Sequence, residues 1–166
     1  ASVLEAARRR DLGTELTALI AEAADYYQTH RDSLAYALGP RLTHGDLHLY
    51  NLIAEQGHVT GLIDWEWAHG SEPDCDLAHL IRWSLYPWHP AEEALEAVST
   101  REVFAPLIPV LLDAYPEFAA VPRLLERMTI YELEHDLHQI SLGATEQPQA
   151  RLQGWLRERI LDPFLA

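Results

Sequence analysis

Apolar side chains recur every three or four residues over most of this chain, which is the spacing of an amphipathic helix. The clearest example runs from Thr14 to His30, where Leu16 and Leu19 share one face. It continues or restarts over Asp32 to Leu38 and stops at Gly39-Pro40. The same spacing predicts five further helices, around Leu77 to Ser84 with an end near Pro87, and over Glu92 to Val98, Val103 to Tyr115, Val121 to Ile140 and Gln149 to Ile160.

One stretch, Leu42 to Gly70, departs from the helical pattern and reads "LTHGDLHLYNLIAEQGHVTGLIDWEWAHG". The runs Leu52 to Glu55 and Val59 to Ile63 favour strands, and Gln56-Gly57 between them favours a hairpin turn. The predicted fold class is therefore mainly α with one small antiparallel β-hairpin. The polar side chains of this stretch lie on loops and a hairpin set into a helical body, where sites are commonly built.

Composition limits the classes of protein that need to be considered. With 166 residues and 18.9 kDa the chain is one domain, long enough to bury a core. A net charge of −14 argues against a nucleic-acid partner, because phosphate backbones need a basic face, and suits a cationic ligand. No apolar run approaches the roughly 20 residues of a membrane span, and no signal-peptide pattern opens the sequence. The single cysteine, Cys75, fits a reducing compartment, so we expect a cytoplasmic protein without membrane contact.

The polar stretch contains the residues that phosphoryl transfer from ATP requires. Such a reaction needs a carboxylate to orient and deprotonate the acceptor hydroxyl, and oxygen ligands that hold Mg²⁺ on the phosphates. Asp46 and Asn51 have the spacing Asp-x-x-x-x-Asn, which lets one loop supply both a base and a metal ligand. The predicted hairpin then returns the chain, so that a second carboxylate, that of Asp64, reaches the same metal.

Three other interpretations compete with this one. The acidic residues could serve as helix caps and turn formers between helices. His44, Asp46 and His48 could form a hydrolase metal triad, but alternate residues need an extended strand, and no distant partners are spaced to complete the site. The third concerns "YELEHDLH", Tyr131 to His138, which invites a zinc interpretation but has the pattern of a polar helix face. On that face three acidic side chains are candidates for substrate binding: Glu132, Glu134 and Asp136.

Three ordered motifs resemble those of the aminoglycoside phosphotransferase family, which is related to choline kinases and more distantly to protein kinases. The motifs are "HGDLHLYN" from His44 to Asn51, "GLIDWE" from Gly61 to Glu66, and "GSEPDCDLA" from Gly70 to Ala78. Two departures are Glu72, where the family usually has Asp, and Leu49-Tyr50 in place of a common Pro-Gly or Pro-Glu. The resemblance implies the C-terminal catalytic lobe of a protein-kinase-like fold.

The resemblance also implies residue roles. Asp46 would be the catalytic base, Asn51 and Asp64 would bind Mg²⁺, His44 would brace the catalytic loop, and Asp76 would anchor that loop from the helix behind it. His48 is given no role. The implied activity is an ATP- and Mg²⁺-dependent transfer of the γ-phosphate to a hydroxyl of an aminoglycoside-like or amino-alcohol acceptor, as in antibiotic resistance.

We expect one domain, 1–166, with the catalytic loop at 44–51, the metal-binding segment at 61–67 and a helical substrate-binding subdomain at 75–166. Kinases of this group also have an N-terminal lobe with a lysine that contacts the nucleotide phosphates. Only about 41 residues precede the catalytic loop here, and the chain has no lysine. We therefore expect the nucleotide lobe to be absent, supplied in the same polypeptide or by a second chain, and the chain alone to be inactive. The alternative is a non-catalytic, kinase-derived module that binds a cationic ligand or a protein partner.

Overall fold

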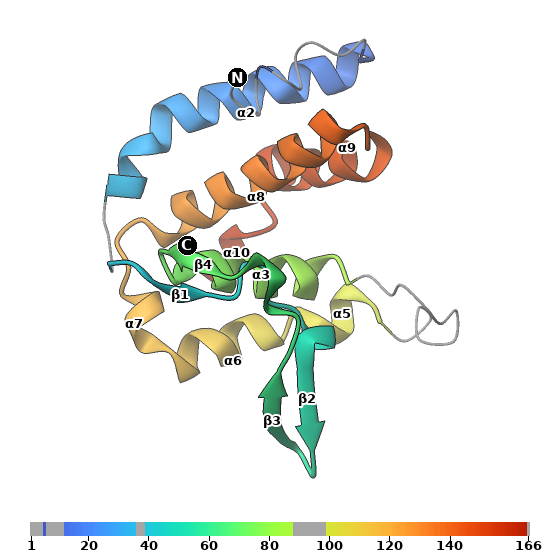
Figure 1. Ribbon diagram of the computed structural model, residues 1–166. Coiled ribbons are helices and arrows are strands. Elements are labelled where there is room, and N and C mark those ends of the chain that lie inside the picture. Colours follow the sequence, from blue (N-terminus) through green and yellow to red (C-terminus); the bar gives the residue numbers. More distant parts are fainter. Residues whose placement is uncertain (1–4, 6–11, 36–38, 88–98, 166) are drawn as a thin grey trace. The chain divides into compact units, whose positions relative to one another are not determined.

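The computed structural model describes residues 5, 12–35, 39–87 and 99–165 (Figure 1). The chain forms two compact units. One, here called the helical unit, comprises Ala1–Tyr36 and Val121–Ala166, and the other, the central unit, comprises Ala37–Ala120. The predicted helical subdomain 75–166 is thus shared between the two units, and the single-domain organisation stays a prediction.

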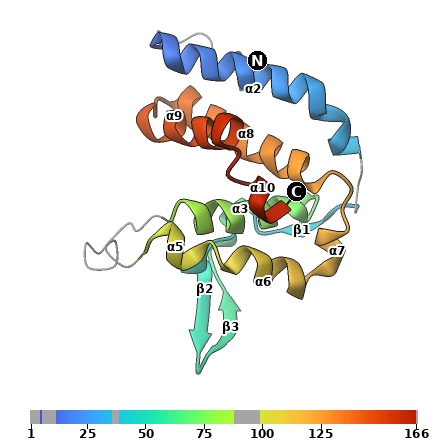
Figure 2. The same ribbon diagram turned by 180° about the vertical axis from the view of Figure 1, so that it is seen from behind.

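The helical unit is built on α2 (Thr14–His30), which packs against α8 (Leu124–Leu142) and α9 (Glu146–Gln153), as Figures 1 and 2 both show. Shorter elements follow α2 and α9: the 3₁₀ helix η1 (Arg31–Ala35), the π-helical turn η4 (Gly154–Glu158) and α10 (Asp162–Leu165). Apolar side chains from α2, α8, α9 and η4 form the core, including Leu19, Ile20, Met128, Ile140, Leu152 and Trp155.

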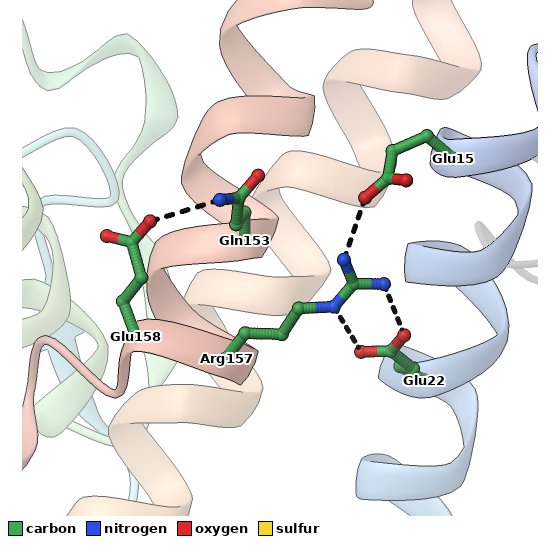
Figure 3. Close-up of polar contacts among 5 residues, drawn as sticks. All are labelled: Glu15, Glu22, Gln153, Arg157 and Glu158. Carbon is green, nitrogen blue, oxygen red and sulfur yellow. Dashed lines mark hydrogen bonds and ion pairs between the residues drawn. The ribbon is translucent and has the colours of Figure 1, made fainter.

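Two polar contacts tie η4 to its neighbours. Trp155 donates its indole N–H to the buried Asp136 carboxylate at 2.8 Å, and Arg151 pairs with the other oxygen of that carboxylate at 2.7 Å. Arg157 reaches α2, where its guanidinium holds Glu22 through Nε at 3.0 Å and Nη2 at 2.5 Å, and Glu15 through Nη1 at 2.7 Å (Figure 3). The π-helical turn therefore presents two side chains, Trp155 and Arg157, to two different helices, α8 and α2.

The central unit contains α3 (Asp74–Leu85), α5 (Arg101–Phe104), α6 (Leu107–Ala114) and α7 (Pro116–Ala119), with α3 packed against α5 and α6. The hairpin of β2 (Leu52–Glu55) and β3 (His58–Leu62) projects away from these helices (Figures 1 and 2). Gln56 and Gly57 form its turn with φ of +52° and +80°, the left-handed conformations that a tight hairpin turn requires. A second antiparallel pair, β1 (Arg41–Thr43) with β4 (His69–Ser71), was not predicted from the sequence.

The fold class is confirmed: the described part of the chain is mainly helical, with two small antiparallel sheets. The helix Thr14–His30 has the predicted bounds, and the hairpin differs only by starting β3 at His58 and ending it at Leu62. No helix among the described residues is long and apolar enough to cross a membrane.

Three predicted helices have different bounds. The helix expected over Val103 to Tyr115 is divided at Pro106, whose ring cannot donate a backbone hydrogen bond and crowds the preceding turn. The helix expected from Val121 begins only at Leu124 and ends at Leu142, where the following Gly143 adopts a φ of +116°. The last predicted helix begins at Glu146, and its second half forms the π-helical turn. The helix predicted over Glu92 to Val98 lies outside the described residues.

Candidate active site

The pairing of β1 with β4 brings together the two ends of the polar stretch. Thr43 is paired with His69, and its hydroxyl donates to the His69 carbonyl at 2.9 Å. Residues 44–68 therefore form one long segment whose two ends are held together by the β1–β4 pair, here called the excursion. Its outgoing arm leads from His44 to the β2–β3 hairpin, and its returning arm leads from the hairpin to Ala68. A site built on this excursion draws its residues from both arms.

Asp76, in the first turn of α3, holds the beginning of the loop. Its two carboxylate oxygens each accept one backbone hydrogen bond, from the His44 N–H at 2.8 Å and from the Gly45 N–H at 2.9 Å. Hydrogen bonds to a charged acceptor are stronger than neutral ones, so this bidentate contact fixes the path of the chain just before Asp46.

Gly45 makes a close approach that no other residue could make. Its φ is +80°, and a Cβ added to it would lie 2.4 Å from the carbonyl oxygen of Trp67. Trp67 ends the 3₁₀ helix η3 (Trp65–Trp67), which follows Asp64 directly. The contact therefore locks the outgoing arm of the excursion against the returning arm.

His44 joins the same two arms through its side chain. The residue is 2% exposed, and its ring Nε2 lies 2.8 Å from the Ile63 carbonyl oxygen. A carbonyl oxygen only accepts, so Nε2 carries the hydrogen and donates it. The ring also packs at a tilt against Trp65, with centroids 4.9 Å apart. With Nε2 engaged in this way, His44 braces the residue next to Asp64 instead of facing a metal.

Asn51 is hydrogen-bonded to the segment of Asp46 and to the segment that precedes Asp64. It ends the 3₁₀ helix η2 (Leu49–Asn51), is 5% exposed, and donates from Nδ2 to the Asp46 carbonyl oxygen at 2.9 Å. Its own carbonyl accepts the Ile63 N–H at 2.9 Å. Asp64, the residue after Ile63, has φ +64° and ψ +56°. Residues other than glycine seldom adopt this left-handed conformation, and where they do, it is frequently at a functional site. Hydrogen bonds thus connect Asp46, Asn51 and the residue preceding Asp64.

The chemistry of these donors fits Mg²⁺. The Asn51 amide directs Nδ2 to the loop backbone, which leaves its oxygen for a cation, and Asp64 adds an exposed carboxylate. Amide and carboxylate oxygens are the ligands that Mg²⁺ takes, usually one or two from protein and the rest from phosphates and water. Among the described residues, no group of three or more His, Cys, Asp or Glu side chains could hold a metal ion.

Two histidines that received no role lie near Asp46. His48 places Nε2 3.5 Å from the Asp46 carboxylate and 3.4 Å from the Asn51 amide nitrogen. His79, on α3, is partly buried, and this burial lowers the pKa of its imidazole, against the opposing effect of the Asp46 and Asp76 charges. The repetition of His in "HGDLH" was the available signal for His48, whereas nothing in the helical pattern marked His79.

The acidic residues predicted for substrate binding lie on α8, in the helical unit. Asp136 has both carboxylate oxygens engaged by Arg151 and Trp155, which supports a structural role. Glu132 is buried, and Glu134 is exposed. A contact of any of the three with substrate stays a prediction.

Comparison with known proteins places these features in one family. The model of the phosphotransferase enzyme family matches residues 2–120, which include all three motifs of the polar stretch. The chain belongs to the phosphotransferase enzyme family. No curated protein matches the sequence.

Two solved structures are similar in fold, and both are of a thermostable mutant of aminoglycoside phosphotransferase APH(4)-Ia. The apo form is 22% identical with a TM-score of 0.57. The ternary complex with AMP-PNP and hygromycin B is 20% identical with a TM-score of 0.59. In both cases the match covers 89% of this chain and 46% of the other, so the chain spans about half the length of these neighbours. The likeness shows the fold of an aminoglycoside phosphotransferase.

Proposed function

We propose that this chain is the catalytic and acceptor-binding part of an ATP- and Mg²⁺-dependent kinase that phosphorylates a hydroxyl of a small molecule. One observation carries the proposal: hydrogen bonds from the Asn51 amide to the Asp46 backbone carbonyl, and from the Ile63 N–H to the Asn51 backbone carbonyl, connect the segments that carry the proposed base and the two proposed oxygen ligands. Membership of the phosphotransferase enzyme family supports the same reaction class.

In the proposed reaction, Asp46 orients the acceptor hydroxyl and receives its proton as the oxygen attacks the γ-phosphorus. The Asp46 side chain is 41% exposed, so an acceptor from solvent can reach it. Asn51 Oδ1 and the Asp64 carboxylate would hold Mg²⁺. When bound, Mg²⁺ would neutralise charge on the phosphate oxygens.

The rest of the site keeps this geometry fixed before substrate arrives. Asp76 holds the loop backbone, His44 holds the segment before Asp64, and Gly45 brings the two arms into contact. Preorganisation matters here because phosphoryl transfer depends on positioning and charge stabilisation more than on covalent chemistry.

The acceptor we propose is cationic, such as an aminoglycoside or an amino alcohol. The net charge of −14 favours a cationic ligand, and the APH(4)-Ia neighbour was solved with hygromycin B and AMP-PNP. Phosphorylation of an aminoglycoside would be an antibiotic-resistance activity, carried out in the cytoplasm where ATP is available. A nucleotide lobe would be supplied in the same polypeptide or by a second chain.

A non-catalytic binding module is the second candidate, and the absence of lysine favours it for this chain alone. Such a module would bind the same cationic ligands but transfer no phosphate. The two candidates differ in a single measurement, which is phosphate transfer in the presence of a nucleotide lobe.

The test measures transfer from labelled ATP to a panel of aminoglycosides and amino alcohols, with the chain joined to a nucleotide lobe and with the chain alone. We expect Asp46→Asn to lower kcat by about 10²- to 10⁴-fold with ATP affinity nearly unchanged, since Asp46 acts on the acceptor. Asp64→Asn should instead weaken Mg·ATP binding. Asp113→Asn, an equal charge change at an exposed position of α6, is the control and should match wild type. Full activity of Asp46→Asn would remove the proposed base, and transfer by the isolated chain would show that no further lobe is needed.

A further inference from the structure

His48 touches both halves of the proposed site through one ring nitrogen. Nε2 lies 3.5 Å from Asp46 Oδ2 and 3.4 Å from Asn51 Nδ2. The proposed reaction uses Asp46 as the base and Asn51 as a metal ligand, and the imidazole of His48 contacts both residues. Its position is that of a group that restrains the base.

The neighbours of His48 define which ring nitrogen carries the hydrogen. A bare Nε2 would set its lone pair against the lone pairs of the Asp46 carboxylate, whereas an Nε2–H can donate to it. The Asn51 amide nitrogen, 3.4 Å from Nε2, could donate to an Nε2 without hydrogen, but the charged Asp46 carboxylate is the stronger partner for an Nε2–H. The Asn51 amide cannot be reversed, because its Nδ2 donates to the Asp46 carbonyl oxygen at 2.9 Å. Reversal would place two oxygens in contact.

The other ring nitrogen leads to the same assignment. His48 Nδ1 is buried and has no hydrogen-bond partner among the described residues. A hydrogen on Nδ1 would therefore be a buried donor without an acceptor, which is costly, while a bare Nδ1 is tolerated more easily. Both observations favour the Nε2–H tautomer.

Aromatic packing holds the ring in this place. His48 meets Tyr50 edge-on with centroids 6.0 Å apart, and Tyr50 meets Trp83 in the same way at 6.0 Å. Trp83 in turn packs edge-on against Phe104 at 4.5 Å. Such edge-to-face pairs are favourable arrangements, so the chain of rings links the catalytic loop to α3 and α5.

We propose that His48 is a positioning residue whose Nε2–H restrains the Asp46 carboxylate in the orientation that faces the acceptor hydroxyl, with the ring itself fixed by Tyr50 and Trp83. The proposal rests on the proposed function for its catalytic consequence. His48 transfers no proton: the hydroxyl proton goes to Asp46. The 3.5 Å separation is longer than an ordinary hydrogen bond, as contacts in catalytic sites without substrate often are, and we expect it to shorten when the acceptor binds.

The first test reads the tautomer directly and needs no catalysis. In the 166-residue chain labelled with ¹⁵N-histidine, at alkaline pH where imidazoles are neutral, we expect the His48 hydrogen on Nε2. His44 and His69 are internal standards, because Nε2 of the first and Nδ1 of the second each face a carbonyl oxygen, at 2.8 Å in both cases. The His48→Gln spectrum identifies the resonance by its loss. A hydrogen on Nδ1 would overturn the proposal whether or not the chain is part of a kinase.

The second test compares two amide substitutions in the protein with its nucleotide lobe. The Gln amide nitrogen in His48→Gln reaches the place of Nε2, whereas the shorter Asn of His48→Asn reaches only the place of Nδ1. We expect His48→Asn to lower kcat by about 10²-fold with the KM for ATP unchanged, because the base is misplaced, and His48→Gln to restore most of the rate. Equal kcat for the two variants would refute the positioning role. If the wild-type protein transfers phosphate to no acceptor, the proposed function fails, and the tautomer measurement still decides the contact.

Discussion

Replacement of Asp76 by Asn tests the anchor of the catalytic loop with the smallest change of shape. The wild-type carboxylate accepts two backbone hydrogen bonds, from His44 and Gly45, at 2.8 and 2.9 Å. In Asp76→Asn the amide oxygen can keep one of them as a neutral bond, while the NH₂ group faces the other N–H and leaves it without an acceptor.

The magnitude follows from these two bonds. Hydrogen bonds to a charged acceptor contribute about 1.5–3 kcal/mol each and a neutral one about 1 kcal/mol, so the partly buried site should lose about 2–4 kcal/mol. Since about 1.4 kcal/mol corresponds to a factor of ten, protection of the two amides against hydrogen exchange should fall by about 30- to 1,000-fold.

The assay is hydrogen exchange of the His44 and Gly45 amides, followed residue by residue by NMR in the wild-type chain and in Asp76→Asn. Asp113→Asn provides the control, because it removes the same charge from an exposed position in the central unit. Unchanged exchange of both amides in Asp76→Asn would show that the carboxylate does not hold the loop. An equal loss of protection in Asp113→Asn would attribute the effect to net charge.

Two further predictions concern other parts of the central unit. Gly45→Ala should destabilise the chain in urea by clearly more than Gly57→Ala, because both glycines have φ +80° but only at Gly45 does the new Cβ meet a backbone atom, at 2.4 Å; equal losses would refute the close approach. Burial lowers the pKa of His79, so its imidazole binds a proton more readily in the unfolded chain than in the folded one. The contribution of neutral His79 to folding stability is therefore present above the ordinary pKa of 6.5 and is lost as the pH falls below that value. Urea titrations between neutral pH and about pH 5 should therefore show a smaller loss in His79→Gln than in wild type, and parallel curves would contradict this.

The regular parts of the fold could be predicted because they depend on local pattern. The helix Thr14–His30 has a clear apolar face and a strong stop after it, and the β2–β3 hairpin has a turn sequence between two β-favouring runs. The helix boundary at Pro106 was also readable from proline chemistry, although the periodicity across it concealed the break.

The rest depended on contacts between residues far apart in sequence. The strands β1 and β4 are three residues each, too short for any pattern, and form only because they pair with one another. For the site, the motif spacing indicated Asp46, Asn51 and Asp64, and the structure supplies the hydrogen bonds that gather their segments. The contact of His48 with Asp46 and the engagement of Asp136 by Arg151 and Trp155 arise from side-chain packing, which periodicity does not encode.

The pairing of Arg157 with Glu15 and Glu22 has a consequence for synthesis of the protein (Figure 3). The helical unit is discontinuous, because the whole central unit is translated between α2 and the segments that pack on it. At about 5–20 residues per second, α2 waits for several seconds or longer with Leu16, Leu19 and Ile20 uncovered, while the central unit can already fold. The nascent chain therefore carries α2 with its apolar face uncovered, which chaperones can bind, until η4 has been synthesised and Arg157 pairs with Glu15 and Glu22.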